Sequence, residues 1–197
     1  MRKGKIIFLN GTTSSGKSTL ARTLQERLDT PFYLLTLDNF YIIGPGKFIQ
    51  SDPNQTVSTA LTGFNHTIKT FSDIGIDVIV DHVLLEGDAK EYTVTGLDNM
   101  GECVTLLHEH DVLFVNVTCP LEELRRREIE RGDRNVGDAE KLLERLCPKD
   151  TYDITVDTFK DTQEECADKI IELLTKTEKH KAFKTLWKQQ TAPAVRG

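Results

Sequence analysis

The feature that most constrains the fold of this chain is a loop bracketed by two glycines near the N-terminus. It reads Gly11-Thr12-Thr13-Ser14-Ser15-Gly16-Lys17-Ser18 and is followed by Thr19. Gly, four residues, Gly, Lys and Ser is the spacing of the phosphate-binding loop, which is informative only between a strand and a helix. Here an apolar run at 5–10 precedes it, and leucines recur at helical spacing after it, at positions 20, 24 and 28. This agreement argues against the alternative, a chance Gly- and Ser-rich turn.

The composition of the loop predicts contacts with a nucleoside triphosphate. Gly11 and Gly16 permit backbone conformations that a Cβ would hinder, so that successive N–H groups can face phosphate oxygens. The N-terminus of the next helix adds unpaired donors. We expect Lys17 at the β- and γ-phosphates and the Ser18 hydroxyl at Mg²⁺. The predicted nucleotide-binding residues are Gly11, Thr12, Thr13, Ser14, Ser15, Gly16, Lys17, Ser18 and Thr19.

Strand-like and helix-like segments alternate along the rest of the chain. Further strands are predicted at 31–37, 76–85, 111–118 and 152–157, and helices at 57–74, 104–109, 121–131, 138–147 and 162–175. Strands that alternate with helices are joined by crossovers and run parallel. The prediction is an α/β fold with a doubly wound, parallel, five-stranded sheet, whose ligands bind at the carboxyl ends of the strands.

Length and charge narrow the class of protein. The 197 residues suit one domain, which we place at 1–177, followed by a basic C-terminal tail or helix at 178–197. The net charge of −6 argues against nucleic-acid and anionic-membrane partners. No apolar run reaches membrane-spanning length. The four cysteines form no CxxC pair, which favours reduced thiols and a cytoplasmic protein.

Two aspartates follow predicted strands at the same sheet edge. Asp38 lies where a γ-phosphate is expected, so it could accept the proton of a substrate hydroxyl or help to hold Mg²⁺. A helix N-cap explains its position equally well. Asp81 ends a buried apolar run, as does the acidic residue that orients Mg²⁺ in nucleotide sites. Capping of a neighbouring backbone N–H is the alternative for Asp81. The predicted metal ligands are Ser18 and Asp81.

A second informative stretch is rich in arginine. Arg127, Arg131 and Arg134 are spaced by four and then three residues, which places them on one face of a helix and its end. Arginines bind phosphate oxygens and stabilise a transferring phosphoryl group, and a closing lid can deliver them. A solvated face with Glu/Arg pairs is the alternative. If the arginines belong to a closing lid, the predicted catalytic residues are Asp38, Lys17 and Arg134.

Three further patterns carry less information. The sequence His108-Glu109-His110 could suggest a metal site, but side chains two apart on a helix face different ways, so we expect exposed surface instead. Residues 98–101 match a short GTPase switch pattern, which we discount because no guanine-reading motif follows. The Lys-rich end at 176–188 could be a free basic helix, although packing against the domain is the simpler prediction.

Together, these segments resemble the chloramphenicol phosphotransferase family. The resemblance rests on the opening segment 6–18, Asp38, the strand end at 78–81, the lid segments at 127–128 and 131–134, and the blocks at 152–158 and 165–167. It implies that Asp38 is the base for a substrate hydroxyl. Two departures stand out: His82 replaces a second aspartate that the family tends to have, and residues 39–70 show no match to the acceptor-binding part.

The resemblance implies ATP-dependent transfer of the γ-phosphate to a hydroxyl of a small molecule, with ATP and Mg²⁺ as cofactors. The resemblance suggests chloramphenicol as the acceptor, and phosphorylation would then inactivate this antibiotic. Another small metabolite or a nucleoside is the first alternative, and a non-catalytic ATP-binding regulator is the second. A homo-oligomer is left open by the sequence.

Overall fold

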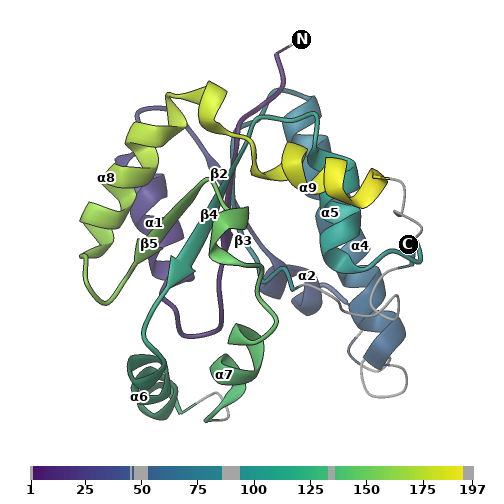
Figure 1. Ribbon diagram of the computed structural model, residues 1–197. Coiled ribbons are helices and arrows are strands. Elements are labelled where there is room, and N and C mark those ends of the chain that lie inside the picture. Colours follow the sequence, from purple (N-terminus) through teal and green to yellow (C-terminus); the bar gives the residue numbers. More distant parts are fainter. Residues whose placement is uncertain (1, 45, 47–52, 86–93, 133–135, 193–197) are drawn as a thin grey trace.

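The computed structural model describes residues 2–44, 46, 53–85, 94–132 and 136–192 (Figure 1). Its centre is one sheet of five strands in the order β2-β3-β1-β4-β5, and every pair is parallel. The strands are β1 (Ile6–Asn10), β2 (Tyr33–Thr36), β3 (Val78–Asp81), β4 (Val112–Thr118) and β5 (Ile154–Asp157). The predicted fold class, a doubly wound parallel sheet of five strands, is confirmed.

Helices cover both faces of the sheet (Figure 1). One face carries α1 (Lys17–Arg27) and α8 (Gln163–Leu174), and the other carries α4 (Pro53–Asp73), α5 (Asn99–Leu107) and α9 (Ala182–Thr191). Three more helices lie beyond the carboxyl ends of the strands: α2 (Leu37–Ile42), α6 (Leu121–Arg131) and α7 (Asp138–Leu143). The short 3₁₀ helices are η1 (Lys149–Thr151) and η2 (Thr177–Lys179).

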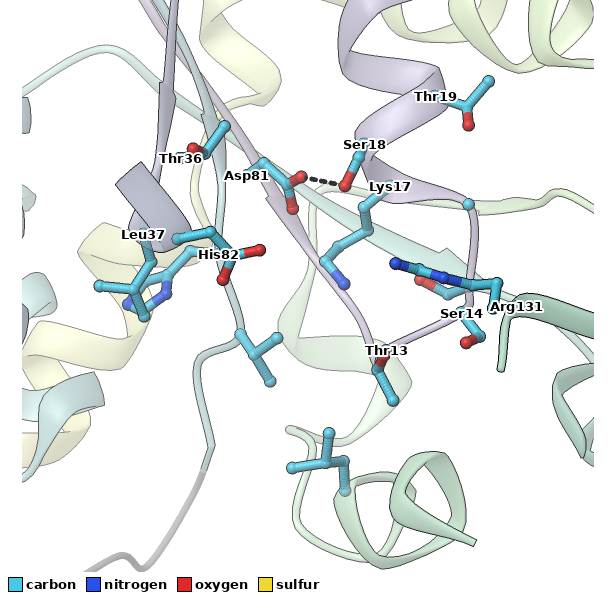
Figure 2. A pocket seen from close by; sticks show the side chains of 15 residues that line it. Thr13, Ser14, Lys17, Ser18, Thr19, Thr36, Leu37, Asp81, His82 and Arg131 are labelled. Carbon is cyan, nitrogen blue, oxygen red and sulfur yellow. Dashed lines mark hydrogen bonds between the residues drawn. The ribbon is translucent and has the colours of Figure 1, made fainter. Parts of the chain in front are cut away.

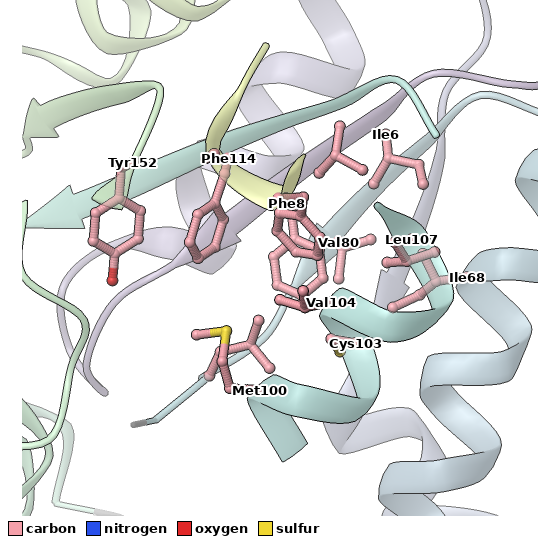
Figure 3. Packing of buried hydrophobic residues seen from close by; sticks show 14 of the residues in the cluster. Ile6, Phe8, Ile68, Val80, Met100, Cys103, Val104, Leu107, Phe114 and Tyr152 are labelled. Atoms are coloured by element: carbon pink, nitrogen blue, oxygen red, sulfur yellow. The ribbon is translucent and has the colours of Figure 1, made fainter. Parts of the chain in front are cut away.

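The alternation of side chains in β1 explains why both faces are covered. Phe8 points into a cluster with Phe64 of α4 and Leu107 of α5, part of which Figure 3 shows. Its neighbour Leu9 points the other way and packs with Leu24 of α1. Successive residues of a strand face opposite sides, so a strand buried on both sides must be apolar throughout. The compact apolar runs that predicted the strands have this cause.

Several element boundaries differ from the sequence prediction, among them those of β3, α5 and α7. The strand expected at 76–85 ends at Asp81, because the Asn10 side chain exchanges two hydrogen bonds with the backbone of Leu84, at 2.7 and 3.0 Å. Helix α5 begins at Asn99 rather than at 104, because the Asp98 carboxylate accepts the N–H of Gly101 as an N-cap. Helix α7 ends at Leu143, short of the predicted 147.

Two expectations drawn from composition concern membranes and cysteines. Within the described ranges, no helix is both long and apolar enough to cross a lipid bilayer. Cys103, Cys119, Cys147 and Cys166 are buried, and the described residues contain no disulfide between them.

The C-terminal helix α9 is part of the main core. Phe183 is 2% exposed, and its ring centroid lies 5.6 Å from that of Phe8 and 5.1 Å from that of Phe114. The Asp153 carboxylate accepts the backbone N–H groups of Lys181 and Ala182, which ties the start of α9 to the segment before β5. The expectation of packing against the domain is therefore met by α9, while the proposed boundary at residue 177 stays a prediction.

We predict that Phe183→Ala lowers the free energy of unfolding by about 3–5 kcal/mol, because it leaves a cavity between two aromatic rings. The neighbouring Lys184→Ala is the matched control, since Lys184 is exposed on the same helix, and its effect should stay within about 0.5 kcal/mol. Urea denaturation of both variants measures the difference. Equal stabilities would contradict the placement of α9 in the core.

A buried histidine ties η2 to the start of β4. His180 Nδ1 contacts Asp111 Oδ1 at 2.5 Å, and Nε2 contacts the Leu173 carbonyl oxygen at 3.1 Å. Burial is the largest single influence on the pKa of His180 and lowers it, but the hydrogen bonds to Asp111 and Leu173 outweigh burial, so the pKa is raised above 6.5. The protonated ring is therefore favoured in the folded state.

We predict that this contact makes stability depend on pH. A pKa raised by folding contributes stability that is complete below the unfolded value of 6.5 and is lost as the pH rises through the folded value. The difference in unfolding free energy between the wild-type protein and His180→Gln should therefore shrink as the pH increases above neutrality. Denaturation curves across this range provide the measurement, and a difference that grows with pH would be the opposite result.

Candidate functional site

A cavity of about 270 Å³ lies at the carboxyl ends of the central strands (Figure 2). Residues 13–19 of the glycine-bracketed loop and the start of α1 form one wall. The ends of β2 and β3 and the first turn of α2 bring in Asp38, Asp81 and His82, and α6 adds Arg131. Loops at this edge of a parallel sheet converge on one space, which is where such folds bind ligands.

The loop follows a backbone path that its residue types make accessible. Gly16 is the N-cap of α1 with φ of 90°, and Ser14 has φ of 60°. Left-handed values of this kind suit glycine, and they turn successive N–H groups towards one side. A Cβ on Gly11 would lie 2.4 Å from the carbonyl oxygen of Val117, so glycine is also required for close packing on β4. The result is a concave backbone at a helix N-terminus, the geometry that binds phosphate.

Lys17 lies across the inner side of this loop. Its side chain is buried, and Nζ donates to the carbonyl oxygens of Gly11 at 2.8 Å and of Thr12 at 2.7 Å. The ammonium group also lines the cavity, as Figure 2 shows. A positive charge in this place can neutralise phosphate oxygens that sit in the loop.

Ser18 and Asp81 provide paired oxygen ligands. The Ser18 hydroxyl donates to Asp81 Oδ2 at 2.6 Å (Figure 2). The register of β1 and β3 pairs Leu9 with Asp81, which places the carboxylate beside the loop that follows β1. A hydroxyl and a carboxylate are the hard oxygen donors that Mg²⁺ prefers, and Mg²⁺ commonly completes its shell with water and phosphate. Among the described residues, no cluster of three or more His, Cys, Asp or Glu side chains could hold a metal by itself. The pair therefore fits Mg²⁺ held together with a phosphate ligand.

Asp38 lies in the first turn of α2, at the cavity and in contact with solvent. The sequence placed it after a strand and left an N-cap as the alternative. That alternative is wrong, because Thr36 is the N-cap residue of α2. The Asp38 charge also acts on Tyr41, whose pKa is raised first by burial and then by this carboxylate. Asp38 is thus an accessible carboxylate that shares the cavity with the phosphate loop.

The predicted lid arginines differ in their surroundings. Arg127 donates to the Ser14 carbonyl oxygen at 3.3 Å, to Thr158 Oγ1 and its carbonyl oxygen at 3.2 Å, and to Glu123 at 2.8 Å. It therefore braces the loop from outside. Arg131 lines the cavity one helical turn later. Arg134 lies outside the described residues, so its predicted catalytic role stays a prediction.

His82 is a cavity residue to which sequence reasoning assigned no role. It is 2% exposed, and its Nε2 lies 3.0 Å from Asn99 Nδ2. Burial lowers the pKa of His82 to about 3, and the Lys17 charge adds to this shift. The available signal was its position directly after Asp81 at the end of an apolar strand.

The other histidine expectation needs a correction. His110 was expected on the exposed surface but is 5% exposed, because its Nε2 bonds to Asp73 Oδ1 at 2.9 Å. Burial lowers its pKa, and the Asp73 contact partly opposes this. His108 instead stacks on Trp187 of α9, with ring centroids 4.3 Å apart. The two side chains point in different directions, as the sequence argument expected, and they form no joint metal site.

The chain is similar to known proteins in both sequence and fold. The sequence model of the family described as chloramphenicol phosphotransferase-like protein matches residues 4–175. An adenylyl-sulfate kinase of Clostridium acetobutylicum is 28% identical over 184 residues, which cover 88% of this chain and 84% of the relative. A Mycobacterium tuberculosis protein provisionally named an O-phosphotransferase is 27% identical, over 70% of this chain and 67% of its own length.

Solved structures show the same fold at low sequence identity. The Mycobacterium tuberculosis APS kinase CysC, in complex with AMPPNP and APS, superposes with a TM-score of 0.59 and 18% identity, over 89% of this chain and 99% of that one. The Deinococcus radiodurans tunicamycin resistance protein gives a TM-score of 0.62 and 18% identity, over 87% and 96%.

We predict that Arg127→Ala weakens ATP binding by about tenfold, because the loop loses the hydrogen bond to Ser14 and the link to Thr158. Arg125→Ala is the matched control on the same helix, since Arg125 is exposed and pairs with Glu140 instead. Isothermal titration calorimetry with ATP and Mg²⁺ measures both affinities. Equal affinities would show that the loop does not need this brace.

Proposed function

The chain belongs to the chloramphenicol phosphotransferase-like family, and we propose that it moves the γ-phosphate of ATP to a hydroxyl group of a small molecule. The observation that carries the proposal is that one cavity is lined by the phosphate loop, by Ser18 and Asp81, and by the Asp38 carboxylate. Groups suited to the phosphate donor, to Mg²⁺ and to the proton of the acceptor thus share one space.

The donor half of the reaction uses the loop and its lysine. The backbone N–H groups of the loop would hold the β- and γ-phosphates, and Lys17 would balance their charge. Ser18 and Asp81 would hold Mg²⁺, which when bound draws charge from the phosphate oxygens. Because Lys17 and the loop are fixed by hydrogen bonds before the nucleotide binds, little reorganisation is needed at the moment of transfer.

The acceptor half uses Asp38. The hydroxyl oxygen of the acceptor forms a bond to the γ-phosphorus, its proton passes to the Asp38 carboxylate, and the bond between the γ-phosphorus and the oxygen of ADP breaks. Arg131 lines the same cavity and would stabilise the negative charge on the transferring group. Arg134, from the same arginine-rich segment, is proposed as its partner. Movement of α6 and α7 over the cavity would exclude water.

Chloramphenicol is the first acceptor to test, because of the family to which the chain belongs. One relative is named an adenylyl-sulfate kinase and another provisionally an O-phosphotransferase, so the same chemistry on another metabolite or a nucleoside is the alternative. The discriminating experiment incubates the purified chain and MgATP with chloramphenicol, adenylyl sulfate, shikimate, gluconate or a nucleoside. Mass spectrometry then detects a gain of one phosphoryl group. Nucleotide binding without acceptor-dependent ATP consumption across a broad screen would favour an ATP-binding regulator instead.

We predict that Asp38→Asn lowers turnover by at least about a hundredfold, because the amide cannot take the proton of the acceptor. Asp29→Asn is the matched control, since Asp29 is exposed and lies outside the cavity, and it should leave turnover unchanged. Coupled measurement of ADP release provides the rates. Near-wild-type turnover of Asp38→Asn would remove Asp38 as the base, whereas Lys17→Ala should still abolish activity through loss of phosphate binding.

A further inference from the structure

A line of buried polar side chains leads from the interface of α4 and α5 to the cavity. Asn65 of α4 is fully buried and donates from Nδ2 to Glu102 Oε2 at 2.6 Å and to Asn99 Oδ1 at 2.9 Å. Asn99, the first residue of α5, presents its Nδ2 to His82 Nε2 at 3.0 Å. His82 in turn lines the cavity of the proposed active site. Buried polar groups that are linked by hydrogen bonds in this way depend on one another, since each one fixes the orientation of the next.

The direction of these hydrogen bonds is determined at the far end of the line. Cys103 donates its S–H to Asn65 Oδ1 at 3.0 Å, and the Glu102 carboxylate also accepts from Thr95 at 2.8 Å. A carboxylate only accepts, so the contact between Asn65 and Glu102 at 2.6 Å requires that the amide nitrogen of Asn65 faces Glu102, with its oxygen towards Cys103. Asn99 must then receive with its oxygen and donate with its nitrogen. An amide nitrogen only donates, so His82 Nε2 is the acceptor and the ring proton is on Nδ1.

The Nδ1–H group of His82 is left over by this arrangement. Among the described residues it has no hydrogen-bond partner, although it is buried. The ring cannot easily turn to find one, because it packs edge-on against Phe64, with centroids 5.2 Å apart, and lies 6.0 Å from Phe8. A buried donor without a partner is costly, and a site that keeps one is suited to a ligand that supplies the acceptor.

Resting on the proposed kinase function, we propose that the Nδ1–H of His82 donates a hydrogen bond to a second oxygen of the acceptor molecule. This oxygen belongs to a hydroxyl, carbonyl or ether group near the hydroxyl that receives the phosphate. Asn99 is a positioning residue that keeps the proton on Nδ1. Leu37, at the start of the helix that carries Asp38, lines the same cavity as His82 (Figure 2). Nδ1 is shielded from water, so binding of the acceptor would require the first turn of α2, which lines the same cavity, to shift.

The inference also states which molecules are disfavoured. A donor-only group, such as an ammonium, placed at His82 would face another donor and leave both unpaired. A compound that lacks the oxygen at this position should therefore bind more weakly than an otherwise identical compound that has it.

The first test needs no acceptor. Long-range ¹H–¹⁵N correlation spectra of the full chain labelled with ¹⁵N-histidine report which ring nitrogen carries the proton, and the spectrum of His82→Asn assigns the signals of His82. We expect a neutral ring protonated at Nδ1 in the wild-type protein and a mixture of tautomers in Asn99→Leu. A wild-type ring protonated at Nε2 would overturn the proposal, whatever the outcome of the phosphorylation screen.

The second test uses the compound that the phosphorylation screen identifies. His82→Leu should raise the KM for this acceptor by about three- to tenfold, with the KM for ATP unchanged. His82→Asn keeps an N–H one bond from Cγ, where Nδ1 lies in histidine, so it should restore most of the affinity. His110→Leu is the control for the loss of a buried histidine outside the cavity, and it should leave both KM values unchanged.

The outcomes separate the two proposals. An unchanged acceptor KM in His82→Leu, or an equal rise in His110→Leu, would overturn the role of His82 and leave the kinase function intact. If no compound is phosphorylated, the proposed function fails on its own measurement, and the tautomer still decides whether the buried line of amides presents a donor at the cavity.

Discussion

The shape of the phosphate loop depends on hydrogen bonds that its own carbonyl groups receive. Lys17 binds the carbonyl oxygens of Gly11 and Thr12 from inside the loop, and Thr158 binds that of Ser15 at 2.7 Å from the end of β5. Arg127 then holds both Thr158 and the carbonyl of Ser14 from α6. These contacts hold the loop in its curved shape, although the Ser15 N–H is itself bonded to the Thr12 carbonyl oxygen at 3.4 Å. The binding surface for phosphate is therefore built by β5 and α6 as much as by the loop.

The order of the strands brings the remaining groups to this loop. β1 lies between β3 and β4, so the end of β3 places Asp81 on one side of the loop and the end of β4 leads into α6 on the other. The phosphate half of the cavity is fixed by this central part of the sheet. The opposite half, with Asp38 and His82, depends on α2 and on contacts from α5. The chemistry of transfer and the choice of acceptor thus depend on different elements.

The core extends beyond the segment that matches the family. The match ends at residue 175, yet α9 begins at Ala182 and places Phe183 against Phe8 and Phe114. Phe8 is in β1, directly before the loop. A helix that the family segment does not include therefore supports the strand that carries the phosphate site, and the capping of α9 by Asp153 ties it to the approach to β5.

The sequence by itself determined the features that have a local physical cause. The spacing of Gly11, Gly16 and Lys17 predicted the loop, because the backbone conformation and the reach of the lysine depend on neighbouring residues. The helix predicted at 121–131 is α6 (Leu121–Arg131), and the apolar runs predicted five parallel strands. The position of Asp81 after an apolar run was enough to place it at the cavity.

Only the tertiary structure decided what depends on residues far apart in the chain. Asn10 ends β3 through Leu84, 74 positions away, and periodicity cannot show this. The hydrogen bond from Arg127 to the Ser14 carbonyl oxygen joins residues 113 positions apart. Arg127 was predicted as a lid residue, and this contact shows that it also supports the loop. The position of His82 after Asp81 is visible in the sequence, but its contact with Asn99, and through Asn99 with Asn65 on another helix, is not. Hydrogen bonds between distant elements are decided by packing, and packing is a property of the folded chain.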